Sequence, residues 1–155
     1  MEEGNTNCTF YFEDSHTNRK KLFEVALLNA KTGKVLYVLS EELNELPELS
    51  QDLTSLNKHY MKMITFMYVK SIDSLLESIS TLHYWQTIPS TIILDDLSAY
   101  CNKGNLQNAC GVVALLVNTS QVCSKLLSTS CQLHVAIPIA HTGEEYCNVL
   151  YDLYG

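Results

Sequence analysis

The sequence predicts a single α/β domain in which helices cover both faces of a mainly parallel, five-stranded sheet. Five short apolar runs have the length of strands, and stretches of helical periodicity separate them. Strands that alternate with helices are typical of βαβ crossovers, which place successive strands parallel to each other. Several of these runs are apolar at every position, as expected for strands that are covered on both faces. A chain of 155 residues with 46% apolar composition is long enough for one such core, so we expect one domain over residues 1–155.

The first half of the chain contains two predicted strands, Thr9–Phe12 and Val35–Leu39. A helical pattern from Asn18 to Ala30 connects them. It ends at Thr32-Gly33, a pair typical of a helix stop followed by a turn. After the second strand, leucines recur at helical intervals from Glu41 to Leu56, but a proline inside this stretch argues against one unbroken helix.

The second half adds three predicted strands: Met63–Val69, Thr91–Leu94 and Gln132–Ile137. Ser71 suits the N-cap of an amphipathic helix that extends to Tyr84. The stretch Leu106–Leu127 is strongly apolar, so we expect this helix to lie against the sheet. An amphipathic segment, Glu144–Tyr154, closes the chain.

Composition and charge exclude several classes of protein. The net charge of -7 makes the molecule as a whole a poor ligand for nucleic acid, which is usually bound by a basic surface. If the protein acts on DNA, we expect a partner to supply much of the positive charge. The six cysteines form no C-x-x-C pair and no zinc-type cluster, so we interpret them as reduced, largely buried thiols. We find no signal segment and no membrane-length apolar run, and expect a soluble intracellular protein that contacts no membrane.

Two acidic residues follow predicted strands, at the edge where open parallel sheets bind their ligands. The fourth strand ends with Asp95 after an apolar run, a pattern that holds magnesium through water in phosphate-loop ATPases. An aspartate at the end of a buried strand is also common without any nucleotide. The second strand ends in Ser40-Glu41, and a glutamate there can polarise an attacking water when a nucleotide is bound. Alternatively, Ser40 caps the following helix, and Glu41 and Glu42 favour its positive N-terminus.

The first strand and its turn, Glu41 and Asp95 follow the order and rough spacing of a RecA-type ATPase core. The sequence resembles the paralogues of the RecA-family recombinases, and most closely the small paralogue that pairs with a SWIM-domain zinc protein in Shu-type recombination complexes. The resemblance covers most of the chain and is carried by four segments: TFYFEDSHTNRKKLFEVALLNAKTGKVLYVLSEEL, MITFMYVKSIDSLLESISTLH, STIILDDLSAY and VVALLVNTSQ. It implies a RecA-like, P-loop ATPase-type three-layer sandwich with a degenerate phosphate loop.

The resemblance places the phosphate loop at Glu13–Lys20, a turn that contains no glycine. The family motif G-x-x-x-x-G-K-[ST] uses glycines to let backbone amides wrap the phosphates, a lysine for the terminal phosphates and a hydroxyl for the metal. Here Glu13 and Asn18 take the glycine positions, Arg19 the lysine position and Lys20 the hydroxyl position. We therefore expect an ordinary strand-to-helix connection without a cradle of inward-pointing amides. We expect no catalytic residue, no cofactor and no metal site.

The remaining positions of the resemblance are vestigial or basic. Asp95 matches the metal-associated aspartate and Glu41 the water-activating glutamate, but neither has a defined task without a nucleotide. The cluster Arg19-Lys20-Lys21 lies on the first turn of a predicted helix, where positive charge is mildly disfavoured. Two interpretations stay open for this cluster: a solvated surface, or a contact with DNA or a partner. Smaller basic groups are Lys31 with Lys34, and Lys58 and His59 with Lys62.

Three hypotheses about function follow. The resemblance implies a non-catalytic, nuclear subunit of a homologous-recombination accessory complex, which supports recombinase loading or filament stability on single-stranded DNA. Its implied partners are a SWIM-domain zinc protein in a heterodimer, other recombinase paralogues or the recombinase, and DNA through the complex. The second hypothesis is a divergent ATPase with weak turnover through Asp95 and Glu41, which micromolar ATP affinity would support. The third is an unrelated α/β protein-interaction module, which a first strand at the edge of the sheet would favour.

Overall fold

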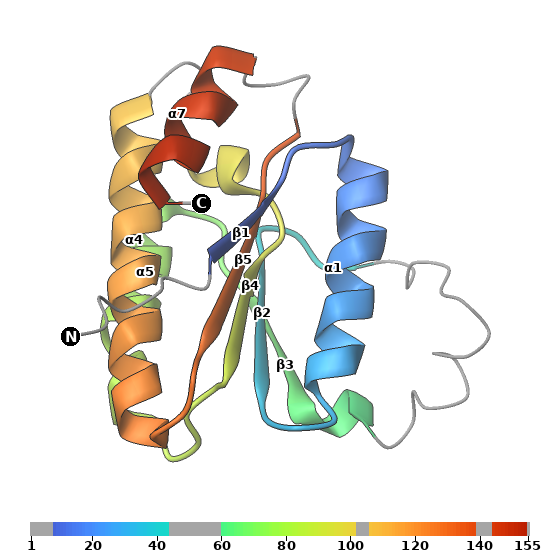
Figure 1. Ribbon diagram of the computed structural model, residues 1–155, viewed down its shortest axis with the longest axis vertical. Coiled ribbons are helices and arrows are strands. Elements are labelled where there is room, and N and C mark those ends of the chain that lie inside the picture. The colour runs from blue at the N-terminus through green and yellow to red at the C-terminus, as the bar shows by residue number, and fades with distance from the viewer. Residues whose placement is uncertain (1–7, 44–59, 102–105, 139–143, 155) are drawn as a thin grey trace.

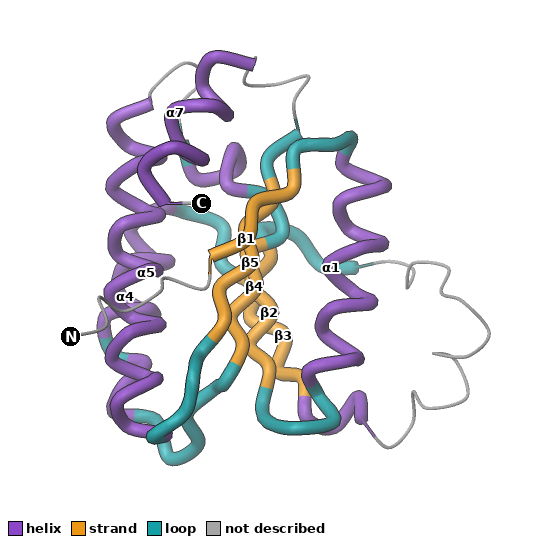
Figure 2. The backbone as a smooth tube through the Cα atoms, in the orientation of Figure 1, coloured by secondary structure: helices purple, strands orange, loops and turns teal. Residues whose placement is uncertain are grey.

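The computed structural model describes residues 8–43, 60–101, 106–138 and 144–154. In this part of the chain, one sheet of five parallel strands lies between two layers of helices (Figures 1 and 2). The strands are β1 (Cys8–Tyr11), β2 (Val35–Leu39), β3 (Ile64–Tyr68), β4 (Thr91–Leu94) and β5 (Gln132–Ala136). The helices are α1 (Ser15–Asn29), α4 (Ile72–Ser80), α5 (Leu106–Leu127) and α7 (Glu144–Tyr154). Short 3-10 turns are η1 (Met61–Met63), η2 (Leu82–Tyr84) and η3 (Leu97–Tyr100). The structure confirms the predicted α/β fold and the parallel sheet.

The strands lie in the order β1-β5-β4-β2-β3, and every pair is parallel. In the described residues, β1 pairs with β5 alone, so the first strand of the chain forms one edge of the sheet and β3 forms the other. α1 covers one face, and α4, α5 and α7 lie on the opposite side (Figure 1). The first strand is therefore an edge strand, which is the arrangement that favours the third hypothesis above.

Most predicted elements have the expected bounds, and the differences have local causes. α1 begins at Ser15, before the predicted start, because Asp14 caps it. The predicted segment that begins after Ser71 is divided into α4 and η2. Hydroxyl groups of Ser80 and Thr81 donate to the carbonyl groups of Glu77 and Ser78, and these side-chain bonds satisfy the end of α4. The predicted stretch from Glu41 to Leu56, and the basic residues Lys58 and His59, lie largely or wholly outside the described residues.

Two hydrophobic cores lie on the two faces of the sheet. Because strand side chains alternate, Leu36 and Val38 of β2 face α4 and α5, while Tyr37 and its neighbours two residues away face α1. By length and composition, Gln107–Leu127 of α5 could cross a membrane. Val113 and Leu116 of this helix are nevertheless buried in the core beside the sheet. α5 thus lies against the sheet, as its apolar sequence predicts.

Candidate functional site

The carboxyl ends of β4 and β2 meet at a topological switch point. The two strands are neighbours, with Val38 opposite Leu94. Beyond β4 the chain enters η3, whose Leu97 is buried in the core beside α4 and α5, whereas Leu43 beyond β2 packs into the core beside α1. Open α/β sheets bind their ligands where neighbouring strands continue to opposite faces in this way. The residues at these strand ends therefore define the candidate site.

Asp95, at the end of β4, accepts hydrogen bonds from two side chains of the same chain. Arg19 of α1 donates from Nη2 to Oδ2 of Asp95 at 2.7 Å and from Nε to Oδ1 at 3.2 Å. The hydroxyl of Tyr37, in β2, donates to the same Oδ1 at 3.0 Å. The guanidinium thus binds both carboxylate oxygens in the bidentate geometry that gives strong, directional ion pairs. We call Arg19, Tyr37 and Asp95 the polar cluster.

The polar cluster is buried on one side and open on the other. The side chain of Asp95 is 6% exposed, whereas that of Arg19 is 42% exposed, and Tyr37 is fully buried. The hydrogen bond with Asp95, supported by its negative charge, raises the pKa of the Arg19 guanidinium. Burial, together with the nearby carboxylate, raises the pKa of Tyr37, so its hydroxyl keeps the proton that it donates. The cluster is therefore a stable arrangement of donors and acceptor at neutral pH.

The turn between β1 and α1 is closed by its own side chains. Asn18, 1% exposed, donates from Nδ2 to the carbonyl of Glu13 and accepts the N–H of Glu13, both at 3.0 Å. The N–H of Asn18 donates to the carbonyl of Asp14 at 2.9 Å. The Asp14 carboxylate accepts the Thr17 N–H at 2.9 Å and the Thr17 hydroxyl at 2.7 Å. The N–H groups of Glu13, Thr17 and Asn18 thus donate within the turn, whereas a phosphate loop directs such groups at a bound anion. This agrees with the ordinary strand-to-helix connection predicted from the sequence.

Asp14 also places a negative charge at the N-terminus of α1. Its hydrogen bonds from the hydroxyl and then the N–H of Thr17 lower the pKa of the Asp14 carboxyl, which favours the charged form at this position. A carboxylate at a helix N-terminus satisfies the free N–H groups and the helix dipole that an external anion would otherwise use. In this chain, the anion at the start of α1 is therefore a side chain.

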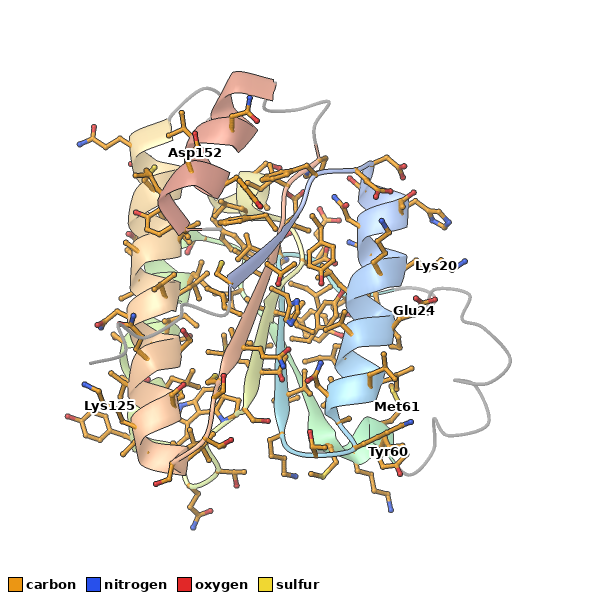
Figure 3. The ribbon with its side chains drawn as sticks, viewed as in Figure 1. Lys20, Glu24, Tyr60, Met61, Lys125 and Asp152 are labelled. Atoms are coloured by element: carbon orange, nitrogen blue, oxygen red, sulfur yellow. The ribbon has the colours of Figure 1, made fainter. Side chains whose placement is uncertain are left out.

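The basic cluster Arg19-Lys20-Lys21 does not form one surface. Arg19 faces the sheet and binds Asp95, while Lys21 forms an ion pair with Glu13. Lys20 is exposed and projects from α1 on the side away from the sheet, as does Glu24 (Figure 3). Successive helical residues are rotated by about 100°, so three adjacent cations cannot share one face. Among the three predicted contacts, Lys20 is the one that forms no ion pair with the described residues.

Glu41 does not join the polar cluster. It is exposed beyond the end of β2 and lines a cavity of about 780 Å³. The described lining consists of residues from three segments at the carboxyl edge: Ser40, Glu41, Glu42, Tyr68, Lys70 and Ala99. Asp95, one strand away, is instead held by α1. The two acidic positions of the resemblance therefore belong to different surroundings.

Tyr37 was not among the residues expected at the site. The sequence does contain a signal, since a hydroxyl-bearing residue interrupts the run Val-Leu-Tyr-Val-Leu and the strand period of two assigns it to one face. Its contact with Asp95 spans 58 residues, and that of Arg19 spans 76. Contacts of this separation follow from the order of the strands, which local patterns do not specify.

A second polar contact lies near the β1 edge, on the face that carries α1. The hydroxyl of Tyr11 lies 2.8 Å from Nδ1 of His134, and Nε2 of His134 lies 3.0 Å from Oε1 of Gln132. Burial lowers the pKa of His134 to about 4, so the ring is neutral at pH 7. Because Oε1 of Gln132 only accepts, Nε2 carries the proton and Nδ1 accepts from Tyr11. This arrangement satisfies a buried histidine, and its neutral form stabilises the fold.

No protein-family model matches the sequence, and no curated protein matches it. Within the described residues, no three His, Cys, Asp or Glu side chains are grouped so that they could hold a metal ion.

Proposed function

We propose that the chain is a non-catalytic subunit of a homologous-recombination accessory complex, of the RecA-like recombinase-paralogue type. In this role it would support recombinase loading or filament stability on single-stranded DNA in the nucleus. The observation that carries the proposal is the ion pair between Arg19 and Asp95. It joins the residue that the resemblance places at the lysine position of a phosphate loop to the residue that it places at the metal-associated position. A chain with this pairing is suited to binding other molecules and not to hydrolysing a nucleotide.

Nucleotide binding would have to disrupt the closed site. A phosphate group at the turn would need Arg19 to leave Asp95, whose side chain is 6% exposed. Separation of a buried ion pair costs about 3–5 kcal/mol when one charge is left without a partner. The same phosphate would approach Glu13 and the capping carboxylate of Asp14, which repel it. These costs oppose the divergent-ATPase hypothesis. The different surroundings of Glu41 and Asp95 are a further observation against it.

The partners proposed from the resemblance are a SWIM-domain zinc protein in a heterodimer and other recombinase paralogues or the recombinase. The net charge of -7 supports an arrangement in which the complex, and mainly the partner, holds the DNA phosphates. Of the basic cluster, Lys20 is the residue that we assign to DNA or partner contact, since Arg19 and Lys21 are in ion pairs within the chain.

A second candidate is an unrelated α/β protein-interaction module. It is favoured by the position of β1 at the edge of the sheet, because a RecA-type core would have this strand between other strands. Both candidates are binding functions without catalysis. They differ in the identity of the partner, and that difference decides between them.

Coexpression with a SWIM-domain protein tests the first candidate. We expect a heterodimer that binds single-stranded DNA more tightly than either subunit alone, and we expect Lys20→Glu to weaken that binding. A chain that remains alone while the SWIM-domain protein is folded would contradict the recombinase-paralogue proposal and favour the interaction module. Calorimetric titration with magnesium and ATP provides the second measurement. Saturable binding at micromolar concentration would contradict the recombinase-paralogue proposal in its strict form and favour the divergent ATPase.

A further inference from the structure

We propose that the groove between α4 and α5 is a docking site for a basic amphipathic helix of a protein partner. This proposal names the chemistry of the partner segment, and it rests on the proposed function in assuming that the chain acts by binding a protein partner. The site lies on the opposite side of the sheet from the polar cluster and α1. It is therefore separate from the polar cluster and from the turn between β1 and α1.

The groove contains a cavity that has room for an apolar anchor. Its volume is about 220 Å³, and it is lined by Ile79 and Ser80 of α4 and by Leu115, Asn118, Thr119 and Val122 of α5. Ser80 and Asn118 are exposed, so the cavity reaches the surface. An aliphatic cavity of roughly 150 Å³ can hold benzene. A leucine or phenylalanine side chain from outside therefore fits between the two helices.

The outer surface of α5 extends this groove along the helix. Six of its exposed positions are spaced alternately by four and three residues: Gln107, Gly111, Ala114, Asn118, Gln121 and Lys125. This spacing forms a straight stripe of the kind that packs against another helix. The stripe has no charge before Lys125, although solvent-facing helix surfaces usually carry charges. The surface thus resembles a contact face more than a solvated one.

Gly111 supports the same interpretation. A Cβ atom at this position would meet nothing within 4 Å, so the packing of the chain itself does not require glycine. Glycine weakens a helix interior relative to alanine. At an exposed position, however, it lets a second helix approach the backbone closely. An external contact therefore gives a reason for this residue that the isolated chain does not.

The charges around the groove select the partner. Among the described side chains of α4, α5 and α7, three carboxylates are exposed, Asp73, Glu77 and Asp152, and one ammonium, Lys125. Asp152 and Lys125 project from α7 and from the far end of α5, respectively (Figure 3). Carboxylates disfavour a second copy of the same face and an anionic membrane, and they attract lysine and arginine. A helix with apolar residues on one side and basic residues beside them matches both the cavity and its rim.

Synthetic peptides provide the test. The first peptide is an amphipathic helix of leucine and lysine, and the second has glutamate in place of each lysine. Fluorescence anisotropy with the full chain measures their affinities. We expect the leucine–lysine peptide to bind about tenfold more tightly than its acidic counterpart. Asn118→Trp, which fills the cavity from an exposed position, should weaken binding about tenfold.

A matched pair of charge reversals separates the groove from general electrostatic attraction. Glu77→Lys on α4 should weaken binding of the leucine–lysine peptide about fivefold, whereas Glu24→Lys on α1 should leave it unchanged. Circular dichroism checks that each variant is folded. Equal loss in both variants, or unchanged binding in Asn118→Trp, would overturn the proposal. Two other results would also overturn it. In the first, the chain forms a dimer that Asn118→Trp abolishes. In the second, the chain binds neutral phosphatidylcholine vesicles and Asn118→Trp abolishes that binding.

The SWIM-domain partner distinguishes failure of this inference from failure of the proposed function. If Asn118→Trp copurifies with that partner in full yield and the peptides do not bind, the groove proposal fails and the proposed function stands. If the unmodified chain binds the leucine–lysine peptide at the groove but does not copurify with the SWIM-domain protein, the groove is supported and the recombinase-paralogue function is contradicted.

Discussion

Asp95 and Glu41 follow adjacent strands at the same edge of the sheet, yet their surroundings are opposite. The side chain of Asp95 is 6% exposed and accepts hydrogen bonds from Arg19 and Tyr37. Glu41 is exposed and lines an open cavity. α1 lies over the first position, so its carboxylate needs partners from the chain, while water can solvate the second. The comparison shows that a shared sheet edge does not give two acidic residues a shared site.

Removal of Arg19 should have the largest effect on this contrast. Arg19→Ala leaves the Asp95 carboxylate buried without a cation, and we expect the free energy of unfolding to fall by about 3 kcal/mol. The value is at the low end of the range for buried pairs because the Arg19 side chain is 42% exposed. Urea denaturation measures the change. Arg19→Lys keeps the charge but loses the bidentate geometry, so its free energy of unfolding should lie between those of the unmodified chain and Arg19→Ala.

A loss below about 0.5 kcal/mol in Arg19→Ala would mean that water solvates Asp95 after all. In that case water would solvate the carboxylates at both strand ends, and the contrast between Asp95 and Glu41 would not hold.

Acid should destabilise the other buried polar contact, at His134. Above its ordinary pKa of 6.5 the histidine is neutral in both folded and unfolded chains, and the stability of the neutral contact is fully present. As pH falls from 6.5 towards the folded pKa of about 4, the unfolded chain takes up a proton that the folded chain does not. Each pH unit in this window costs at most about 1.4 kcal/mol, and with partial hydration we expect about 2 kcal/mol in total.

The measurement is the difference in unfolding free energy between the unmodified chain and His134→Gln across this pH range. The difference removes the contribution of carboxylates such as Asp14, which titrate in both proteins. Parallel pH profiles would show that the ring is not held neutral by burial.

Loss of the Tyr37 hydroxyl should have a smaller effect. Tyr37→Phe removes one of the donors to Asp95 and keeps the aromatic packing, so we expect a loss of about 1 kcal/mol in unfolding free energy. The double variant with Arg19→Ala tests whether the residues act as one cluster. Strictly additive losses would indicate two independent contacts and would weaken the description of a polar cluster.

Glu41→Gln should have the smallest effect. An exposed side chain without an ion pair in the described part of the chain contributes little, so the unfolding free energy should change by less than about 0.5 kcal/mol. Thermal denaturation at neutral pH is sufficient to measure it. A loss as large as that of Tyr37→Phe would place Glu41 in a contact and remove the contrast with Asp95.

Local sequence patterns predicted the elements better than the site. The runs at β2 and β4 are buried at every position, and their apolar sequences predict this directly. The same patterns placed Asp95 and Glu41 at the carboxyl edge, which is correct. They did not bring Arg19 to Asp95, because that contact depends on the order of the strands and on which face α1 covers. Nor did they separate Arg19, Lys20 and Lys21, whose directions depend on where the helix begins.

The pairing of Arg19 with Asp95 also restricts how this sequence can change over time. Replacement of Arg19 alone leaves the largely buried carboxylate of Asp95 without its cation. A glycine-containing loop and a lysine at position 19 would therefore not arise here by small independent steps, since the intermediate sequences give a less stable protein. In related sequences, residues at positions 19 and 95 should accordingly vary together, because a change at one position alters which residues the other tolerates.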